Sequence, residues 1–114
     1  MKPYHGDYDK KPDRETLRFL NEMEKYDGYI FATPTHWVST STLMKILIDN
    51  LTYWEVSGFK LEGKVVGVVS HCWEDGGFTV ARDLIGILNT MGAIVPPYAI
   101  NTQNKYLKKN EETE

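Results

Sequence analysis

The chain alternates between segments whose apolar residues recur at helical spacing and short runs that are apolar almost throughout. Three apolar runs stand out, at residues 29–33, 64–70 and 93–95. Runs of this length with few polar residues are typical of strands buried on both faces of a parallel sheet. The pattern therefore predicts three buried strands, each preceded by a helix.

The three helical segments have start or stop signals as well as apolar stripes. Asp13 is the expected N-cap of the first helix, and Ser39, Thr40 or Ser41 caps the second. Gly92 stands where a C′ glycine would end the third. The apolar positions are Leu17, Phe19, Leu20 and Met23 in the first helix, Leu43, Met44, Leu47, Ile48 and Leu51 in the second, and Ala81, Leu84, Ile85, Leu88 and Met91 in the third.

This order of elements defines the expected fold class. Helices that alternate with strands are typical of right-handed crossovers, which build a parallel α/β sheet with helices on both of its faces. We expect one domain over residues 1–114, with a loop at residues 1–12 and a polar tail at residues 101–114. Residues 52–63 are expected to form a surface connection whose aromatic rings pack down onto the domain.

Polar loops follow two of the predicted strands, at residues 33–39 and 71–77. In open α/β sheets, ligands bind in the crevice outside the carboxyl ends of the strands, where helix N-termini add N–H donors. The two loops are therefore the candidate site. Each also has a simpler interpretation, as a turn that only connects a strand to a helix.

Composition and charge exclude several classes of function. The net charge is −3, and the lysines and arginines form no basic stripe, so we expect no nucleic-acid partner. The sequence has no apolar run of the roughly 20 residues that span a bilayer, and its first residues are too polar for a signal peptide. We therefore expect a cytoplasmic protein that is not inserted in a membrane.

Few residues suggest side-chain catalysis or metal binding. Cys72 is the only cysteine, so the chain forms no intrachain disulfide and no iron–sulfur site made of cysteines alone. His36, His71 and Cys72 lack the CxxC or HxxxH spacing of a zinc site. Ser39 and Ser41 lack a G-x-S-x-G nucleophile elbow. We assign no catalytic side chain and no metal ligand.

The strand, loop and helix around the first candidate loop carry a recognisable motif. The sequence is Asp-Gly-Tyr-Ile-Phe-Ala-Thr-Pro-Thr-His-Trp at residues 27–37, Ser-Thr-Leu-Met-Lys at 41–45 and Asp-Asn at 49–50. It resembles the NAD(P)H-dependent FMN reductase group of the flavodoxin-like fold, in which a Pro-x-Tyr-Trp or Pro-x-Tyr-Tyr loop precedes a helix with Ser, Lys and Asp-Arg positions. Pro34, Trp37, Ser41, Lys45 and Asp49 match this pattern, whereas His36, Val38 and Asn50 depart from it.

Later segments extend the resemblance. Residues 63–70, 76–77 and 91–93 are similar to the family's next strand, glycine loop and following strand, so the resemblance covers roughly residues 13–100. It implies a three-layer parallel sheet of flavodoxin type. It also implies an FMN-dependent oxidoreductase with NADH or NADPH as co-substrate, which passes electrons to a small-molecule acceptor such as a quinone, a free flavin or a metal.

The resemblance also implies which residues contact FMN. Trp37 or Trp73 is expected to flank the nicotinamide pocket. The residues expected to orient the flavin ring are Pro34, Thr35, His36, Trp37, Val38 and Ser39, and those expected to line its far edge are His71, Cys72, Gly76 and Gly77.

The resemblance covers only the second half of that fold. Flavodoxin-like sheets have the strand order 2-1-3-4-5, and this chain supplies the equivalents of strands 3, 4 and 5. The family's first strand and phosphate loop have no counterpart in the sequence, which leaves the predicted strand at residues 29–33 as an exposed edge. We therefore expect a homo-oligomer or a complementing chain. Two alternatives stay open: an FMN-binding electron carrier of flavodoxin type, or a truncated, non-catalytic fragment that needs a partner chain.

Overall fold

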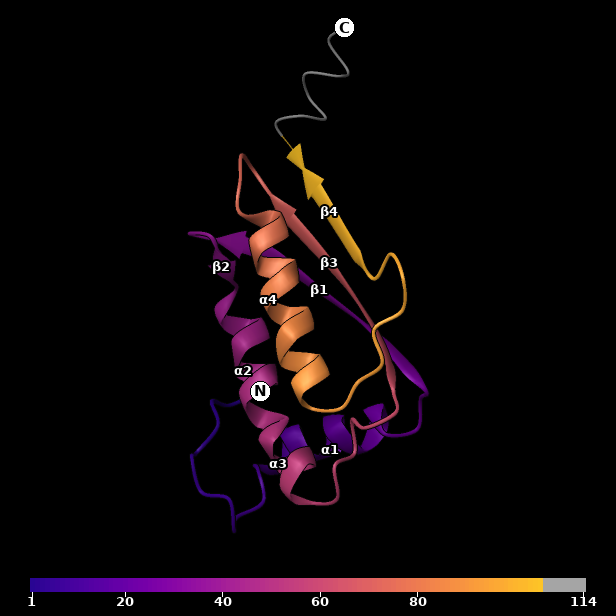
Figure 1. Ribbon diagram of the computed structural model, residues 1–114. Helices are drawn as coiled ribbons and strands as arrows, with labels where there is room; N and C mark the ends of the chain where they lie inside the picture. Colours follow the sequence, from indigo (N-terminus) through magenta and orange to yellow (C-terminus); the bar gives the residue numbers. More distant parts are fainter. Residues whose placement is uncertain (106–114) are drawn as a thin grey trace, which may run out of the picture.

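The computed structural model describes residues 1–105 and contains four helices and four strands within them (Figure 1). No helix among these residues has the length and apolar character that crossing a bilayer requires. In chain order, the elements are α1 (Arg14–Met23), β1 (Gly28–His36), β2 (Ser39–Thr40), α2 (Thr42–Asn50), α3 (Thr52–Val56), β3 (Val65–Cys72), α4 (Gly77–Thr90) and β4 (Ile100–Asn104).

One sheet with the strand order β2-β1-β3-β4 organises the molecule. β1 and β3 are parallel, from the pair Gly28 and Val65 to the pair Pro34 and His71. β4 is parallel to β3, whereas the short β2 pairs antiparallel with the end of β1. The predicted α/β class with a parallel sheet is therefore confirmed, and the three long strands end at the same edge of the sheet.

The helix signals in the sequence are confirmed at three positions. The Asp13 carboxylate accepts hydrogen bonds from the Thr16 amide (3.3 Å) and the Thr16 hydroxyl (2.6 Å), which caps α1. Of the three proposed caps of α2, Ser41 holds the position, and its Oγ accepts from the amide of Met44 (3.1 Å). Gly92 follows α4 with a φ of 96°, which suits a C′ glycine.

The hydrophobic core lies between one face of the sheet and the helices. Figure 1 shows α2 and α4 lying along the sheet in front of it, with α1 and α3 near the amino ends of the strands. The predicted helix stripes are only partly buried, since Phe19 and Leu43 face outward. The buried core residues are Leu20, Phe31, Ile48, Leu51, Trp54, Leu61, Val66, Val68, Val80, Ala81, Leu84, Leu88 and Ala93.

The other face of the sheet is open. Side chains alternate along β1, so Phe31 and Thr33 are buried beneath the helices while Ile30 is 76% exposed on the opposite side. Val65 of β3 is exposed in the same way. The expectation of strands buried on both faces, with helices on both sides, is therefore wrong for the part of the chain that the structure describes.

The third predicted strand is displaced along the sequence. Residues 93–95 only begin to pair with β3, through a single bridge between Ile94 and Val65. Pro96 and Pro97 have no N–H to continue the ladder, so the chain loops out and pairing resumes in β4. Residues 101–104, which we expected to lie in a polar tail, form most of β4. The rest of that tail, from residue 106, lies outside the described residues.

The connection at residues 52–63 also differs from the prediction. It contains the short helix α3, in which Trp54 is buried while Phe59, beyond the helix, stays exposed. Leu51 ends α2 and starts α3, so the chain turns there without leaving the helical region.

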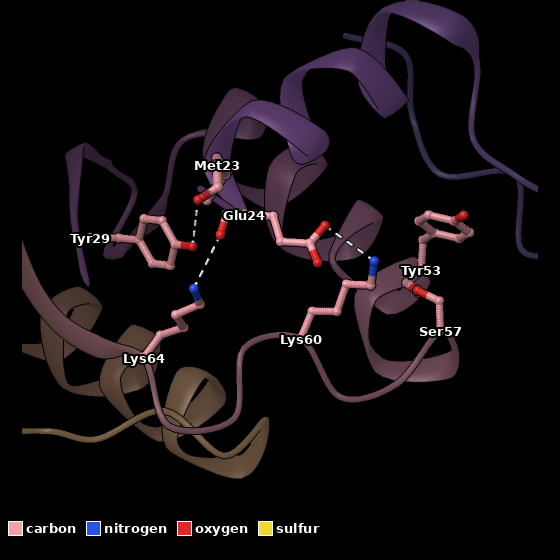
Figure 2. Close-up of polar contacts among 7 residues, drawn as sticks. All are labelled: Met23, Glu24, Tyr29, Tyr53, Ser57, Lys60 and Lys64. Carbon is pink, nitrogen blue, oxygen red and sulfur yellow. Dashed lines mark hydrogen bonds and ion pairs between the residues drawn. The ribbon is translucent and has the colours of Figure 1, made fainter. Parts of the chain in front are cut away.

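Polar contacts join the C-terminal end of α1 to the start of β1 and to the segment before β3 (Figure 2). The Tyr29 hydroxyl donates to the Met23 carbonyl (2.7 Å), and burial raises the pKa of this hydroxyl. The Lys64 ammonium donates to the Glu24 carbonyl (3.2 Å) at the C-terminus of α1, where a positive charge is favourable. Lys60 pairs with the Glu24 carboxylate (3.1 Å). These contacts set where β1 enters the sheet.

Candidate functional site

A β-hairpin forms the first half of the candidate site. The sequence predicted a loop at residues 33–39, but β1 continues to His36, which pairs with Ser39 of β2. Trp37 and Val38 form the two-residue turn, with φ values of 53° and 59°. Such turns require positive φ at both positions, which asparagine and glycine adopt most easily. The chain therefore holds a strained Trp-Val tip, with Trp37 99% exposed, at the end of the strand.

Two buried hydroxyl groups fix the base of the hairpin. The amide of Ser41 donates to Thr33 Oγ1 (3.2 Å), and the Thr33 hydroxyl donates to the Pro34 carbonyl (2.8 Å). Because Ser41 is also the N-cap of α2, the hairpin and the helix are held in one arrangement. The sequence contains a signal for this arrangement, since Thr33 is a polar residue at the end of the apolar run at residues 29–33.

The loop between β3 and α4 forms the second half. β3 runs on to Cys72, and the Ser70 hydroxyl donates to the Gly77 carbonyl (2.6 Å) at the start of α4. A Cβ at Gly77 would lie 2.7 Å from Thr102 Cγ2 and 2.9 Å from Cys72 Sγ. Only glycine lets the helix begin so close to the sheet. The N-terminus of α4 therefore opens at the carboxyl edge of β3.

The two loops contact each other. Gly76 has a φ of 86°, and a Cβ placed there would lie 3.0 Å from Val38 Cα. Pro34 and His71 are also opposite each other in the register of β1 and β3. The hairpin and the second loop thus form one continuous surface at the carboxyl ends of the two central strands, where α/β sheets bind their ligands.

The ten residues predicted to contact a flavin fall into three groups. Thr35 belongs to the half-buried group, and its Oγ1 is a buried oxygen without a hydrogen-bond partner among the described residues. The thiol of Cys72 is 3% exposed beneath Gly77, so it presents no side-chain surface at this edge. The exposed members are Pro34, His36, Trp37, Val38, Ser39 and His71, the half-buried ones are Thr35 and Gly76, and the buried ones are Cys72 and Gly77.

The structure adds two contacts of the second loop, from Asn104 and Lys105, that the sequence did not indicate. The Lys105 ammonium lies 4.2 Å from the centre of the Trp73 ring, a cation–π contact, and Trp73 is 68% exposed. The Asn104 side-chain amide donates to the Glu74 carbonyl. Both contacts hold the second loop against the end of β4. Sequence patterns missed them because β4 was not predicted.

The described residues fit the ring of a flavin better than its phosphate. A flavin ring needs a flat apolar wall with a few aimed polar groups. Among the described residues, Pro34 and Trp37 supply apolar surface, Thr35 supplies a hydroxyl without a hydrogen-bond partner, and the first turn of α4 supplies N–H groups that no side chain caps. Two helix N-termini lie at this surface, but Ser41 Oγ already caps α2 and the Gly76–Gly77 loop before α4 packs against Val38, so among residues 1–105 neither is a separate loop free for the phosphate.

Solved structures share the fold. A crystal structure of RosB with bound 8-demethyl-8-formylriboflavin 5′-phosphate matches with a TM-score of 0.75 at 21% identity, over 98% of this chain and 52% of that one. A WrbA-like flavodoxin from Agrobacterium tumefaciens matches with a TM-score of 0.69 at 20% identity, over 81% and 62% of the two chains. An NADPH-quinone reductase from P. pentosaceus matches with a TM-score of 0.64 at 18% identity, over 82% and 63%.

These matches identify the fold as flavodoxin-like and also show how much of each matched structure the chain covers. The chain spans 52 to 63% of the length of these three structures. It therefore corresponds to part of the fold, in agreement with the truncated sheet that the sequence predicted. No curated protein sequence matches the chain.

Family membership rests on a sequence comparison that covers most of the chain. The family model described as NADPH-dependent FMN reductase matches residues 2–106. The matched region contains both candidate loops and every described strand. This chain belongs to the NADPH-dependent FMN reductase family.

Proposed function

We propose that this chain provides the ring-binding side of an FMN site in an NAD(P)H-dependent oxidoreductase. The observation that carries the proposal is the contact between the two loops, in which Gly76 packs against Val38 at the carboxyl edge of β1 and β3. A mere pair of connecting turns would not need a strained hairpin tip and a glycine held at positive φ beside it. Family membership and flavodoxin-like fold support the same assignment.

Each group at this surface has a limited task. Pro34 and Trp37 form an apolar wall for the ring, and the Thr35 hydroxyl and the first amides of α4 bond to its polar edge. Bound FMN would supply the redox chemistry, taking a hydride from NADH or NADPH and passing electrons to a small-molecule acceptor. No side chain of this chain has to act as an acid or a base. The chain's residues orient the ring and exclude water from one side of it.

The proposed location of the protein is the cytoplasm. Its single cysteine, Cys72, is buried and free, which fits a reducing compartment.

The test has two stages and separates the open alternatives. The purified chain is titrated with FMN by equilibrium dialysis, and NADPH oxidation is then followed at saturating FMN against protein-free FMN. Saturable binding with faster oxidation supports an oxidoreductase. Saturable binding without faster oxidation would instead indicate an electron carrier of flavodoxin type. If no flavin binds, the loops are not a flavin surface, and the non-catalytic fragment becomes the better account.

A further inference from the structure

The open face of the sheet contains an apolar groove on the side away from the helices. The groove has a volume of about 740 Å³ and is lined by residues of β1, β3 and the loop before β4. Ile30, Val65 and Tyr98 are among its exposed apolar members, and none of its lining residues is charged. Parallel sheets are normally covered on both faces, and an apolar surface of this kind marks an interface.

One edge of β1 is also free among the described strands. β2 pairs only with Thr35 and His36, so no described strand lies beside the earlier part of β1. The Val65 amide donates to the Asp27 carbonyl (3.1 Å), and successive residues of a strand turn their backbone groups to alternate sides. The N–H groups of Ile30 and Ala32 therefore point toward the free edge, while their side chains lie on the open face of the sheet.

The two outer edges of the sheet differ in chemistry. β4 carries Asn101, Thr102 and Gln103, which are polar and suit a strand that ends a sheet. β1 presents Ile30 and Ala32 without any of the charged residues or bulges that natural proteins place on exposed edges, and its proline, Pro34, lies beyond them, next to the residues that pair with β2. The part of β1 before Pro34 therefore has the composition of an interior strand.

We infer that β1 and the open face bind a β-strand–helix–β-strand unit from the missing part of this fold. The connections from β1 to β3 and from β3 to β4 run in one direction across the sheet, with their helices on one face. Right-handed crossovers that run in the opposite direction place their helix on the opposite face. Consider a strand that pairs parallel to β1 and is followed, through a right-handed crossover, by a second strand farther from β3. The helix of that crossover lies in the groove. One unit covers the edge and the face together.

The length of the solved relatives supports this occupant over a second copy of the chain. RosB matches 98% of this chain, yet the match covers only 52% of RosB. Its remaining residues belong to the same protein as the matched half. A second copy of this chain offers the same strands and helices again, and has no crossover in the opposite direction among its described residues.

The test uses the part of the RosB chain that lies outside the match as the probe. This segment is co-expressed with the 114-residue chain, and in a second form it precedes Met1 through a flexible linker. Sedimentation velocity gives the mass of each species, and hydrogen exchange gives the protection of individual amides. We expect a one-to-one complex, or a monomeric fusion, in which the Ile30 and Ala32 amides exchange at least tenfold more slowly than in the chain alone.

Two variants show whether the open face is the contact. Ile30→Lys should weaken the complex at least tenfold and remove the protection in the fusion. Leu43→Lys is the matched control, because Leu43 is 78% exposed, close to the 76% of Ile30, but lies on α2. It should leave both readouts unchanged.

Three outcomes would overturn the inference. One is a fusion whose Ile30 amide exchanges as fast as in the chain alone. Another is a complex that Ile30→Lys and Leu43→Lys affect equally. The third is a dimer of the chain alone, lost on Ile30→Lys, which would assign the face to a second copy. Flavin is absent from these experiments, so their failure is distinct from a failure of the proposed flavin site.

Discussion

Gly76 lies against Val38, and a Cβ at position 76 would come within 3.0 Å of the Val38 Cα. This contact joins the hairpin after β1 to the loop after β3. Both residues were expected to contact FMN, but nothing in the sequence indicated that they touch each other, and together they define the shared surface of the candidate site.

Gly76→Ala should push the two loops apart and weaken flavin binding at least threefold. Its matched control is Gly63→Ala, because Gly63 has a similar φ (81° against 86°) but nothing within 4 Å of its Cβ position. Both variants should lose about 1–2 kcal/mol of stability from the positive φ alone. Urea unfolding and equilibrium dialysis measure the two effects. Equal flavin affinities in the two variants would argue against the loop contact.

Thr35→Val should stabilise the flavin-free chain and weaken flavin binding. The Thr35 hydroxyl is buried without a partner in the part of the chain that the structure describes, and an unsatisfied buried polar group costs about 1–3 kcal/mol. The control is Thr40→Val, at the position opposite Thr35 in the hairpin, where the hydroxyl donates to the Ser41 carbonyl (2.9 Å). Thr40→Val should destabilise the chain. A loss of stability in Thr35→Val would show that its hydroxyl already has a partner.

Trp37→Ala should weaken flavin binding by roughly threefold to tenfold, since aromatic stacking contributes about 0.5–1.5 kcal/mol. Trp37 is almost fully exposed, so its removal should leave the midpoint of urea unfolding unchanged. Phe59→Ala removes another exposed aromatic ring, beyond α3, and should alter neither quantity. Unchanged flavin affinity in Trp37→Ala would remove the hairpin tip from the site.

The capping carboxylate of α1 predicts a dependence of stability on pH. The hydrogen bond from the Thr16 hydroxyl lowers the pKa of Asp13 in the folded chain. A carboxyl group whose pKa is lower in the folded chain stabilises the fold at pH values above its pKa in the unfolded chain, about 3.9. This stabilisation is lost as the pH falls through its pKa in the folded chain. Asp13→Asn keeps a capping side chain but does not titrate. The advantage of the wild type over Asp13→Asn in melting temperature should therefore shrink below about pH 4, and a difference that is constant with pH would contradict this.

The sequence predicted the helices better than the strands. Asp13, Ser41 and Gly92 are local signals, and each occupies the cap position that it indicated. β4 was missed because its polar residues pair at the edge of the sheet and bury no regular apolar face. The hairpin was missed because Trp37 and Val38 are poor turn residues, so tertiary contacts rather than local preference hold them there.

The candidate site was predicted as two loops, and the structure brings those loops together. Register explains why, since Pro34 and His71 lie opposite each other near the carboxyl ends of neighbouring parallel strands. The sequence did not indicate the contacts that set the shape of the candidate site. Gly76 against Val38, and Lys105 over Trp73, join residues that are far apart in the chain and depend on how the elements pack.

A comparison of FMN with riboflavin tests the central claim most directly. The claim is that this chain forms the ring-binding side of a flavin site, while the phosphate-binding loop belongs to a part of the fold outside the described residues. Equilibrium dialysis of the purified chain should therefore show saturable binding of both flavins, with dissociation constants within about threefold of each other. A tenfold preference for FMN would correspond to a contribution of about 1.4 kcal/mol from the phosphate. Saturable binding of neither flavin, or a preference for FMN above tenfold, would contradict the account.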